Sequence, residues 1–265
     1  MLLELSQILW SWPLPVALAG THILLTFRLR GIQSQVFQAI RLSFAAAGEK
    51  TGLSGFGALA TSVGAAMGAG NILGMGVAVA VGGPGAVFWF CVAGVLGMAT
   101  QYAESRLCLS FRERDKEGQN WGGPMLVLRK NHHPILADLY AAFVVLASLG
   151  TGCVLQAHAV VQAMEPWHVP APVTSGILVL LSGSVILLGG NWIARASERL
   201  VPAMILLYLL GCMGLLTLCW RQIIPAVGEI LQGAFALPAM GGAGLGAAVQ
   251  SGFARGLLAG EAGLG

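Results

Sequence analysis

The polar residues that could do chemistry in this sequence lie inside long apolar stretches, and one of them sits within a run of glycines. Residues 64–76 read GAAMGAGNILGMG, so the amide of Asn71 is surrounded by five glycines. Each glycine weakens a helix by about 1 kcal/mol relative to alanine. Broken helices inside apolar segments free carbonyl groups for cations and N–H groups for anions. The run therefore predicts a break at 68–71 that lines a cavity, with Asn71 adding one oxygen. For Gly64 and Gly74 alone, close packing of helices is an equally good interpretation.

A second glycine-rich segment, at the end of the sequence, carries a carboxylate. Gly256, Gly260 and Gly263 surround Glu261. A carboxylate within an apolar span is costly, which makes it a functional hypothesis by default. The alternative is that Glu261 pairs with Arg255 and only stabilises a break. Six residues of ideal helix would put these two side chains on different faces, so the pair would require the break.

The fourth apolar block contains Gln156, His158 and Gln162. Such side chains often only bond between helices, which is worth about 0.6 kcal/mol on average. An intramembrane enzyme that uses Glu261, Glu104 or His158 as acid or base is a poor alternative. No nucleophile is paired with a base and no metal-ligand spacing is present, so we predict no enzyme.

The elements that must position these residues are membrane helices. The chain has 265 residues, of which 56% are hydrophobic and 9% charged, whereas soluble domains carry about 25% charged residues. Apolar blocks of roughly twenty residues suffice to cross a hydrocarbon core about 30 Å thick. We therefore predict an all-α membrane protein in a lipid bilayer. The predicted spans are residues 8–27, 56–81, 86–109, 135–163, 173–190 and 200–219, and a seventh block begins near Leu237.

The distribution of basic residues predicts the orientation. Lys and Arg follow the first, third and fifth blocks, while the other loops hold almost none. Cytoplasmic loops carry the excess of Lys and Arg, so we expect a multi-pass inner-membrane protein with its N-terminus outside. The net charge of +3 includes no long basic tract, so no nucleic-acid partner is predicted. Residues 222–236 read as an amphipathic helix at the outer surface.

Several ordered motifs make the sequence similar to the alanine/glycine:cation symporter family, the sodium:alanine symporters, over nearly the whole chain. Residues 68–72 read GAGNI, residues 82–89 GGPGAVFW, residues 97–100 GMAT, and residues 122–124 GGP. The similarity continues at Gln156-Ala157, at Arg255-Gly256 and at Glu261-Ala262-Gly263. It covers the N-terminal part of the family.

The resemblance implies a leucine-transporter-type fold of two inverted repeats, here truncated after repeat one and the start of repeat two. Residues 1–54 would form a peripheral first helix and a cytoplasmic loop. Residues 55–220 would form the first five-helix repeat, and residues 221–265 the interfacial helix and first half of the broken helix that opens repeat two. The implied binding residues for substrate and sodium are Gly68, Ala69, Gly70, Asn71, Gln156, Gly260, Glu261, Ala262 and Gly263, with Asn71 as a sodium ligand.

The implied function is sodium-coupled symport of alanine or glycine by alternating access, with sodium as the coupling ion and no other cofactor. Two departures from the family pattern bear on the substrate, because His158 and Gly260 stand where the family usually has Asn. The alternative function is a non-transporting remnant, or an assembly half that requires a C-terminal partner encoded separately. A second repeat downstream would distinguish these hypotheses.

Overall fold

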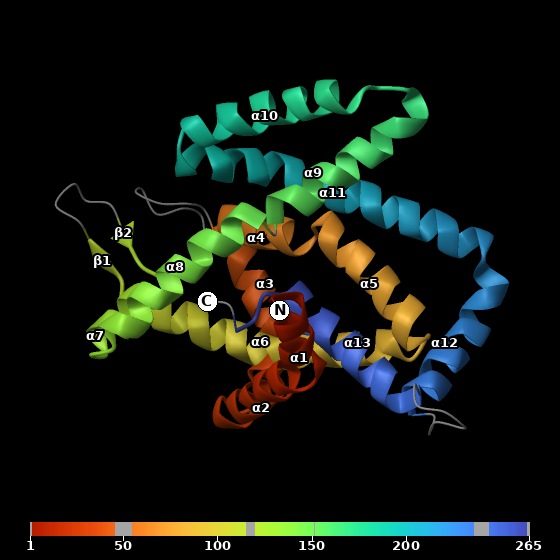
Figure 1. Cartoon of the computed structure of the whole chain (residues 1–265), viewed down its shortest axis with the longest axis horizontal. Helices are drawn as coiled ribbons and strands as arrows, with labels where there is room; N and C mark the ends of the chain where they lie inside the picture. Colours follow the sequence, from red (N-terminus) through yellow and green to blue (C-terminus); the bar gives the residue numbers. More distant parts are fainter. Residues whose placement is uncertain (1, 46–54, 115–119, 151, 236–243, 264–265) are drawn as a thin grey trace. The chain divides into compact units, whose positions relative to one another are not determined.

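The computed structural model describes residues 2–45, 55–114, 120–150, 152–235 and 244–263, almost all of them in helices (Figure 1). It divides into two compact units. The first unit comprises Met1–Ser34, Gly74–Cys153 and Ile230–Gly265, and the second comprises Gln35–Leu73 and Val154–Glu229.

The first unit contains the helices around α6, the longest helix in it. Its helices are α1 (Leu2–Ser11), α2 (Pro13–Arg28), α6 (Ala86–Ser110), α7 (Pro124–Lys130), α8 (Pro134–Gly150) and α13 (Gly244–Gly260). Most of α5 (Ala69–Gly82) also belongs to it. Beyond the C-terminal end of α6, β1 (Glu113–Arg114) and β2 (Asn120–Trp121) form a short antiparallel hairpin.

The second unit is built around α11. It contains α3 (Val36–Ala45), α4 (Gly55–Ala66), α10 (Ala171–Leu187) and α11 (Gly190–Leu218), with most of α9 (Gly152–Met164) and α12 (Trp220–Phe235) and the short 3-10 turn η2 (Glu165–Trp167). Most of the 3-10 turn η1 (Ile32–Gln35) belongs to the first unit. Helix α11 packs against α4 and α10. Gly64 allows α4 to approach α11 closely, because a Cβ on it would lie only 2.7 Å from Cγ2 of Val201.

The first predicted apolar block is not a single helix, and this part of the prediction was wrong. The first block is divided into α1 and α2 at Trp12, because Pro13 has no N–H to continue a helix and instead occupies the first turn of the next one. The fourth block contains α8 and α9, which end and begin at Gly150 and Gly152, and Thr151 between them lies outside the described residues.

The helices have the character of membrane spans. Three segments of the described chain have the length and apolar composition to cross a bilayer, namely Leu59–Gly82, Ala86–Ser110 and Arg195–Leu218. Two shorter apolar helices, Pro134–Ser148 and Ala171–Leu187, correspond to further predicted blocks. The large apolar side chains of α10 and α11 are mostly exposed, as expected where lipid is the solvent. The chain is an all-α membrane protein.

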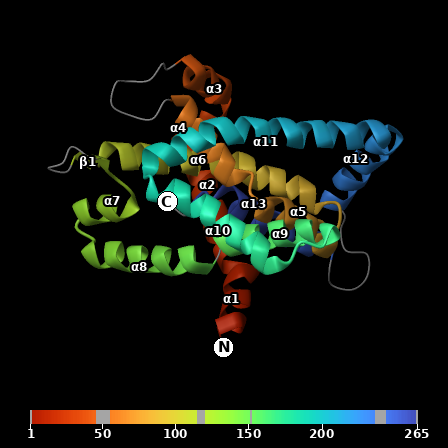
Figure 2. The same ribbon diagram turned by 90° about the horizontal axis from the view of Figure 1, so that it is seen from above.

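Helices α6 and α13 form the centre of the first unit and run side by side in the same direction (Figures 1 and 2). A Cβ on Gly252 would lie 2.9 Å from Cα of Ala86, and one on Gly256 would lie 2.7 Å from Cβ of Ala93. Further along both helices, a Cβ on Gly97 would lie 3.3 Å from Cβ of Ala262. The missing side chains therefore allow the two backbones to approach closely.

Helix α2 follows the direction of α6, whereas α5 runs opposite to α13. Leu18 of α2 packs near Ala93, and His22 contacts Thr100 farther along α6. On the other side, Ser251 Oγ donates to the carbonyl of Ala78 over 3.3 Å, and Gly74 faces Arg255. Rising residue numbers in α13 thus meet falling numbers in α5.

Helix α12 spans the segment that the sequence predicts to be an amphipathic helix. Its C-terminal end belongs to the first unit, where Trp89 Nε1 donates to the carbonyl of Ala234 over 3.0 Å. Phe88 and Phe235 pack edge to face there, with ring centroids 5.0 Å apart. This contact ties the start of α6 to the end of α12.

Candidate functional site

The structure places a helix break at the glycine run, where the sequence predicts one. Helix α4 ends at Ala66 and α5 begins at Ala69, so Met67 and Gly68 separate them. The N–H of Met67 still donates to the carbonyl of Val63 over 2.9 Å, and the N–H of Asn71 donates to the carbonyl of Gly68 over 3.0 Å. The break is therefore a tight two-residue interruption inside the apolar segment Leu59–Gly82.

Asn71 connects the two helix ends across this break. Its side-chain Nδ2 donates to the carbonyl of Ala66, one of the acceptors that the end of α4 leaves without a helical partner. The amide nitrogen is thereby committed to the protein, and the chemistry that the side chain offers to a cation is that of its Oδ1 oxygen.

Gln156 of α9 packs directly on the break. A Cβ placed on Gly68 would lie 2.7 Å from Nε2 and 3.3 Å from Cδ of Gln156, so a larger residue here would displace the amide of Gln156. A Cβ on Gly70 would similarly lie 2.9 Å from a methyl group of the adjacent Leu155. The structure therefore brings Gly68, Gly70, Asn71 and Gln156 together within the second unit.

The break offers both signs of partial charge over a short distance. The last carbonyls of α4 form the negative end of its dipole, and the first N–H groups of α5 form a positive end. Carbonyl and amide oxygens suit a hard cation such as sodium, and helix N-termini suit a carboxylate. Among the described residues no three or more His, Cys, Asp and Glu side chains lie close enough together to hold a metal ion. A cation at this break would be held by neutral oxygens.

Of the two glycines for which close packing was an open interpretation, Gly64 has a close contact and Gly74 does not. A Cβ on Gly74 would lie 3.9 Å from Cδ of Arg255, which is an ordinary van der Waals contact. Gly64 lies against Val201, as described above. Gly74 is therefore a position that alanine can occupy.

The second predicted break lies at the end of α13, in the first unit. The helix ends at Gly260, and residues 261–263 form a turn with Glu261 at φ +51° and Gly263 at φ +99°. Ala262 is buried against Gly97, while Gly260 and Glu261 are exposed. We call Gly260–Gly263 the terminal turn of α13.

Arg255 and Glu261 form no ion pair with each other or with another described residue. Both side chains are exposed, and Arg255 extends along Gly74 of α5. The alternative interpretation, in which Arg255 neutralises Glu261 and stabilises the break, therefore does not apply to this structure.

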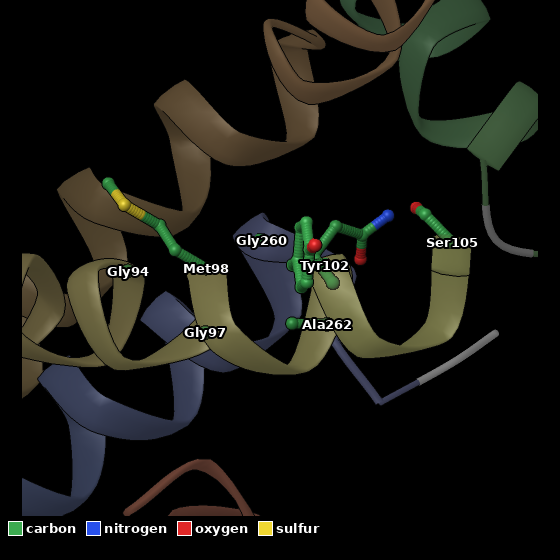
Figure 3. Close-up of a pocket in the computed structure, with 8 residues that line it drawn as sticks. Gly94, Gly97, Met98, Tyr102, Ser105, Gly260 and Ala262 are labelled. Atoms are coloured by element: carbon green, nitrogen blue, oxygen red, sulfur yellow. The ribbon is translucent and has the colours of Figure 1, made fainter. Parts of the chain in front are cut away.

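A pocket of about 440 Å³ lies beside the terminal turn (Figure 3). Gly260 and Ala262 form one wall, and α6 forms the other. In Figure 3 Tyr102 lies between Met98 and Ser105, facing the end of α13. The polar residues here, Gln101, Tyr102 and Ser105, were not predicted, although their recurrence on one face of an apolar helix is a signal that sequence analysis could use.

The sequence profile of the Sodium:alanine symporter family matches residues 1–265. The chain is 37% identical over 270 residues to a protein of Methanococcus maripaludis named sodium/alanine symporter AgcS, covering 98% of this chain and 60% of that one. It is 32% identical to a Bacillus subtilis protein named probable sodium/glutamine symporter GlnT, covering 98% and 55%. An uncharacterized transporter of Haemophilus influenzae is 39% identical, covering 98% and 59%. The chain thus spans less than two thirds of these relatives.

Proposed function

Because the chain belongs to the sodium:alanine symporter family, we propose that the protein imports a small neutral amino acid, alanine or glycine, together with sodium across the cytoplasmic membrane. The observation that carries this proposal is the break between α4 and α5, with the amides of Asn71 and Gln156 against it. Polar groups at such a depth in an apolar span are expensive unless they serve a ligand or a structural bond.

The two ends of the break have separate roles in this proposal. The first N–H groups of α5, at Ala69 and Gly70, bind the carboxylate of the amino acid. The last carbonyls of α4 and Oδ1 of Asn71 bind sodium. Gln156 contacts the amino acid from α9, and Gly260, Glu261, Ala262 and Gly263 provide the second break of the site.

The relatives support a small substrate, because one of them is named a sodium/alanine symporter. One relative is named as a probable sodium/glutamine symporter. A competition series must therefore include glutamine as well as alanine and glycine.

The proposed topology has seven crossings with the N-terminus outside. Crossings one, three and seven are α2, α6 and α13, and crossing two is the α4–α5 segment. Their observed directions agree with this numbering, because α2, α6 and α13 run in parallel and α5 runs opposite to α13. Counting α12 as one more crossing would reverse α13 relative to α6. The agreement therefore supports an α12 that does not cross the membrane, whereas the cytoplasmic side of the Phe111–His133 segment is proposed from its basic residues.

We propose further that these residues contribute one half of an inverted-repeat transporter of the leucine-transporter type. Residues 55–220 would be the first repeat, and a second repeat would complete the site from the same protein or from a separately encoded partner. The relatives support this, because the matched region is only 59% and 60% of two of them.

Uptake of labelled amino acids by cells that carry the natural full-length gene tests the function. We expect uptake of alanine or glycine to require inward sodium and to disappear when potassium replaces sodium. Uptake that does not depend on sodium would contradict the proposal. So would a protein of normal abundance that takes up neither alanine, glycine nor glutamine.

A further inference from the structure

His22 is a buried polar residue to which the proposed binding site gives no role. It lies in α2, is 0% exposed, and has Nδ1 2.6 Å from Oγ1 of Thr100 in α6. Thr100 is itself only 3% exposed. Side chains that bond in this way between apolar helices fix the rotation and register of both helices.

The other ring nitrogen of His22 is directed toward the end of α13. Nε2 is buried and bonds to no described residue. A Cβ on Gly97 would lie 3.8 Å from Nε2 and 3.3 Å from Cβ of Ala262, so the imidazole and Ala262 border the same methyl-sized position. An unsatisfied buried polar atom costs about 1–3 kcal/mol, so a hydrogen-bond partner in some state of the protein is expected.

The terminal turn of α13 is the element that can supply that partner. Glu261 has a left-handed conformation, which costs a non-glycine residue about 1–2 kcal/mol and persists only where neighbouring structure holds it. Both neighbours belong to the α2–α6 pair. A Cβ on Gly263 would lie 2.9 Å from a methyl group of Leu18 of α2, and Ala262 rests on Gly97 of α6.

We propose that His22 is a positioning residue for α13. Its Nδ1 is anchored on Thr100, and its Nε2 limits the movement of the terminal turn by bonding to the backbone of this turn when the turn moves toward it. Helix α2, which lies outside the proposed repeats, thereby takes part in the mechanism. The role in transport rests on the proposed function, but the positioning of Ala262 does not.

The test uses the full-length protein without native cysteines and with Ala262→Cys, whose modification by a small water-soluble thiol reagent reports on the terminal turn. His22→Asn keeps an amide near the position of Nδ1 and has no group at Nε2. We expect normal abundance, about tenfold faster modification and about tenfold lower maximal uptake, with KM little changed, as for the loss of about one hydrogen bond.

Thr100→Val removes the anchor and should also accelerate modification. Its matched control is Thr174→Val in α10, which likewise removes a buried hydroxyl, one that bonds to no described residue. We expect this control to behave like the parent protein. If His22→Asn and Thr100→Val leave the modification rate unchanged, or if Thr174→Val raises it equally, the proposal is wrong.

Gly97→Ala provides a second measurement that leaves His22 and Thr100 in place, in case those variants do not accumulate. It inserts a methyl group between Nε2 and Ala262, whereas Gly94→Ala, one turn earlier, would meet nothing within 4 Å. Faster modification in Gly97→Ala alone supports the positioning role, and equal rates in both variants refute it. Absence of sodium-dependent uptake by the parent protein would contradict the proposed function, while the modification rates would still decide the role of His22.

Discussion

Asn71 shows how one side chain can serve both the fold and a ligand at a helix break. Its amide nitrogen satisfies the carbonyl of Ala66, and the same bond orients the Oδ1 oxygen. In an apolar span the broken backbone needs such internal partners, since no bulk water is present to replace them. The residue is therefore structural and, in the proposed mechanism, also a sodium ligand.

We predict that Asn71→Ala lowers sodium-dependent uptake by about tenfold or more, because it removes a ligand oxygen and a hydrogen bond at the break. The matched control is Gly74→Ala, three residues along the same helix, whose Cβ would make only an ordinary contact. Uptake and quantitative immunoblots of the membrane fraction check both. Normal uptake by Asn71→Ala at normal abundance would contradict the assignment.

A second prediction concerns the contact between Gly68 and Gln156. Gly68→Ala should abolish most of the uptake, because its Cβ would displace the amide of Gln156 from 2.7 Å. Gly76→Ala, in the same helix, would meet nothing within 4 Å and should transport normally. Adding Gln156→Ala to Gly68→Ala should restore abundance but not uptake, because the steric conflict disappears while the proposed substrate contact stays absent. If the double variant transports normally, Gln156 is only a packing residue.

The sequence predicts the break at residues 68–71 because glycine acts locally on helix stability. It does not predict the His22–Thr100 contact, since that bond joins residues of two helices and neither segment alone indicates its partner. The roles of Gln101, Tyr102 and Ser105 depend on the same packing. The ligand contacts of every site residue remain predictions.

At the scale of helices, small residues determine how closely α13 approaches α6. Gly252 and Gly256 of α13 lie against the backbone of α6 itself, and Gly97 faces Ala262 from the other helix. In a bilayer, where lipid is as apolar as leucine, such close packing takes over much of the role that the hydrophobic effect has in water.

We predict that Gly252→Ala destabilises the protein by about 1–3 kcal/mol, because its Cβ would overlap the backbone of Ala86. Gly246→Ala, earlier in α13, would meet nothing within 4 Å and is the control. Melting temperatures of the detergent-solubilised protein, followed by size-exclusion chromatography, measure the difference. Equal melting temperatures would show that α13 and α6 are less closely packed than described.

Hydropathy predicts the apolar blocks well, and it misses the break within the first of them. Pro13 is a local signal for the division of the first block, because it begins α2 and cannot continue α1. Hydropathy does not predict the β1–β2 hairpin or α3, because these elements are too short or too polar to form an apolar block. Helix directions come only from contacts such as Gly256 with Ala93.

At the scale of the whole molecule, the proposed orientation follows from the basic loops and agrees with the parallel directions of α2, α6 and α13. Lys116, one of the basic residues between α6 and α7, lies outside the described residues. Arg114 in β1 and Glu165 in η2 are described and exposed, so they mark the two predicted sides of the membrane.

We predict that a single cysteine at Arg114 reacts with a membrane-impermeant reagent only after the cells are opened, whereas one at Glu165 reacts in intact spheroplasts. The positive-inside distribution requires both results. Mass-shift labelling on gels measures them, with the cysteine-free protein as background. Reversed labelling would place the N-terminus inside and invert the proposed site.

In the proposed mechanism the break between α4 and α5 binds an amino acid and sodium together. Purified full-length protein in sealed vesicles allows this coupling to be measured without other transporters. With an inward sodium gradient, we predict that labelled alanine or glycine accumulates above its external concentration, that a sodium ionophore abolishes the accumulation, and that Asn71→Ala lacks it. Accumulation that persists without a sodium gradient, or that Asn71→Ala retains in full, would contradict the account.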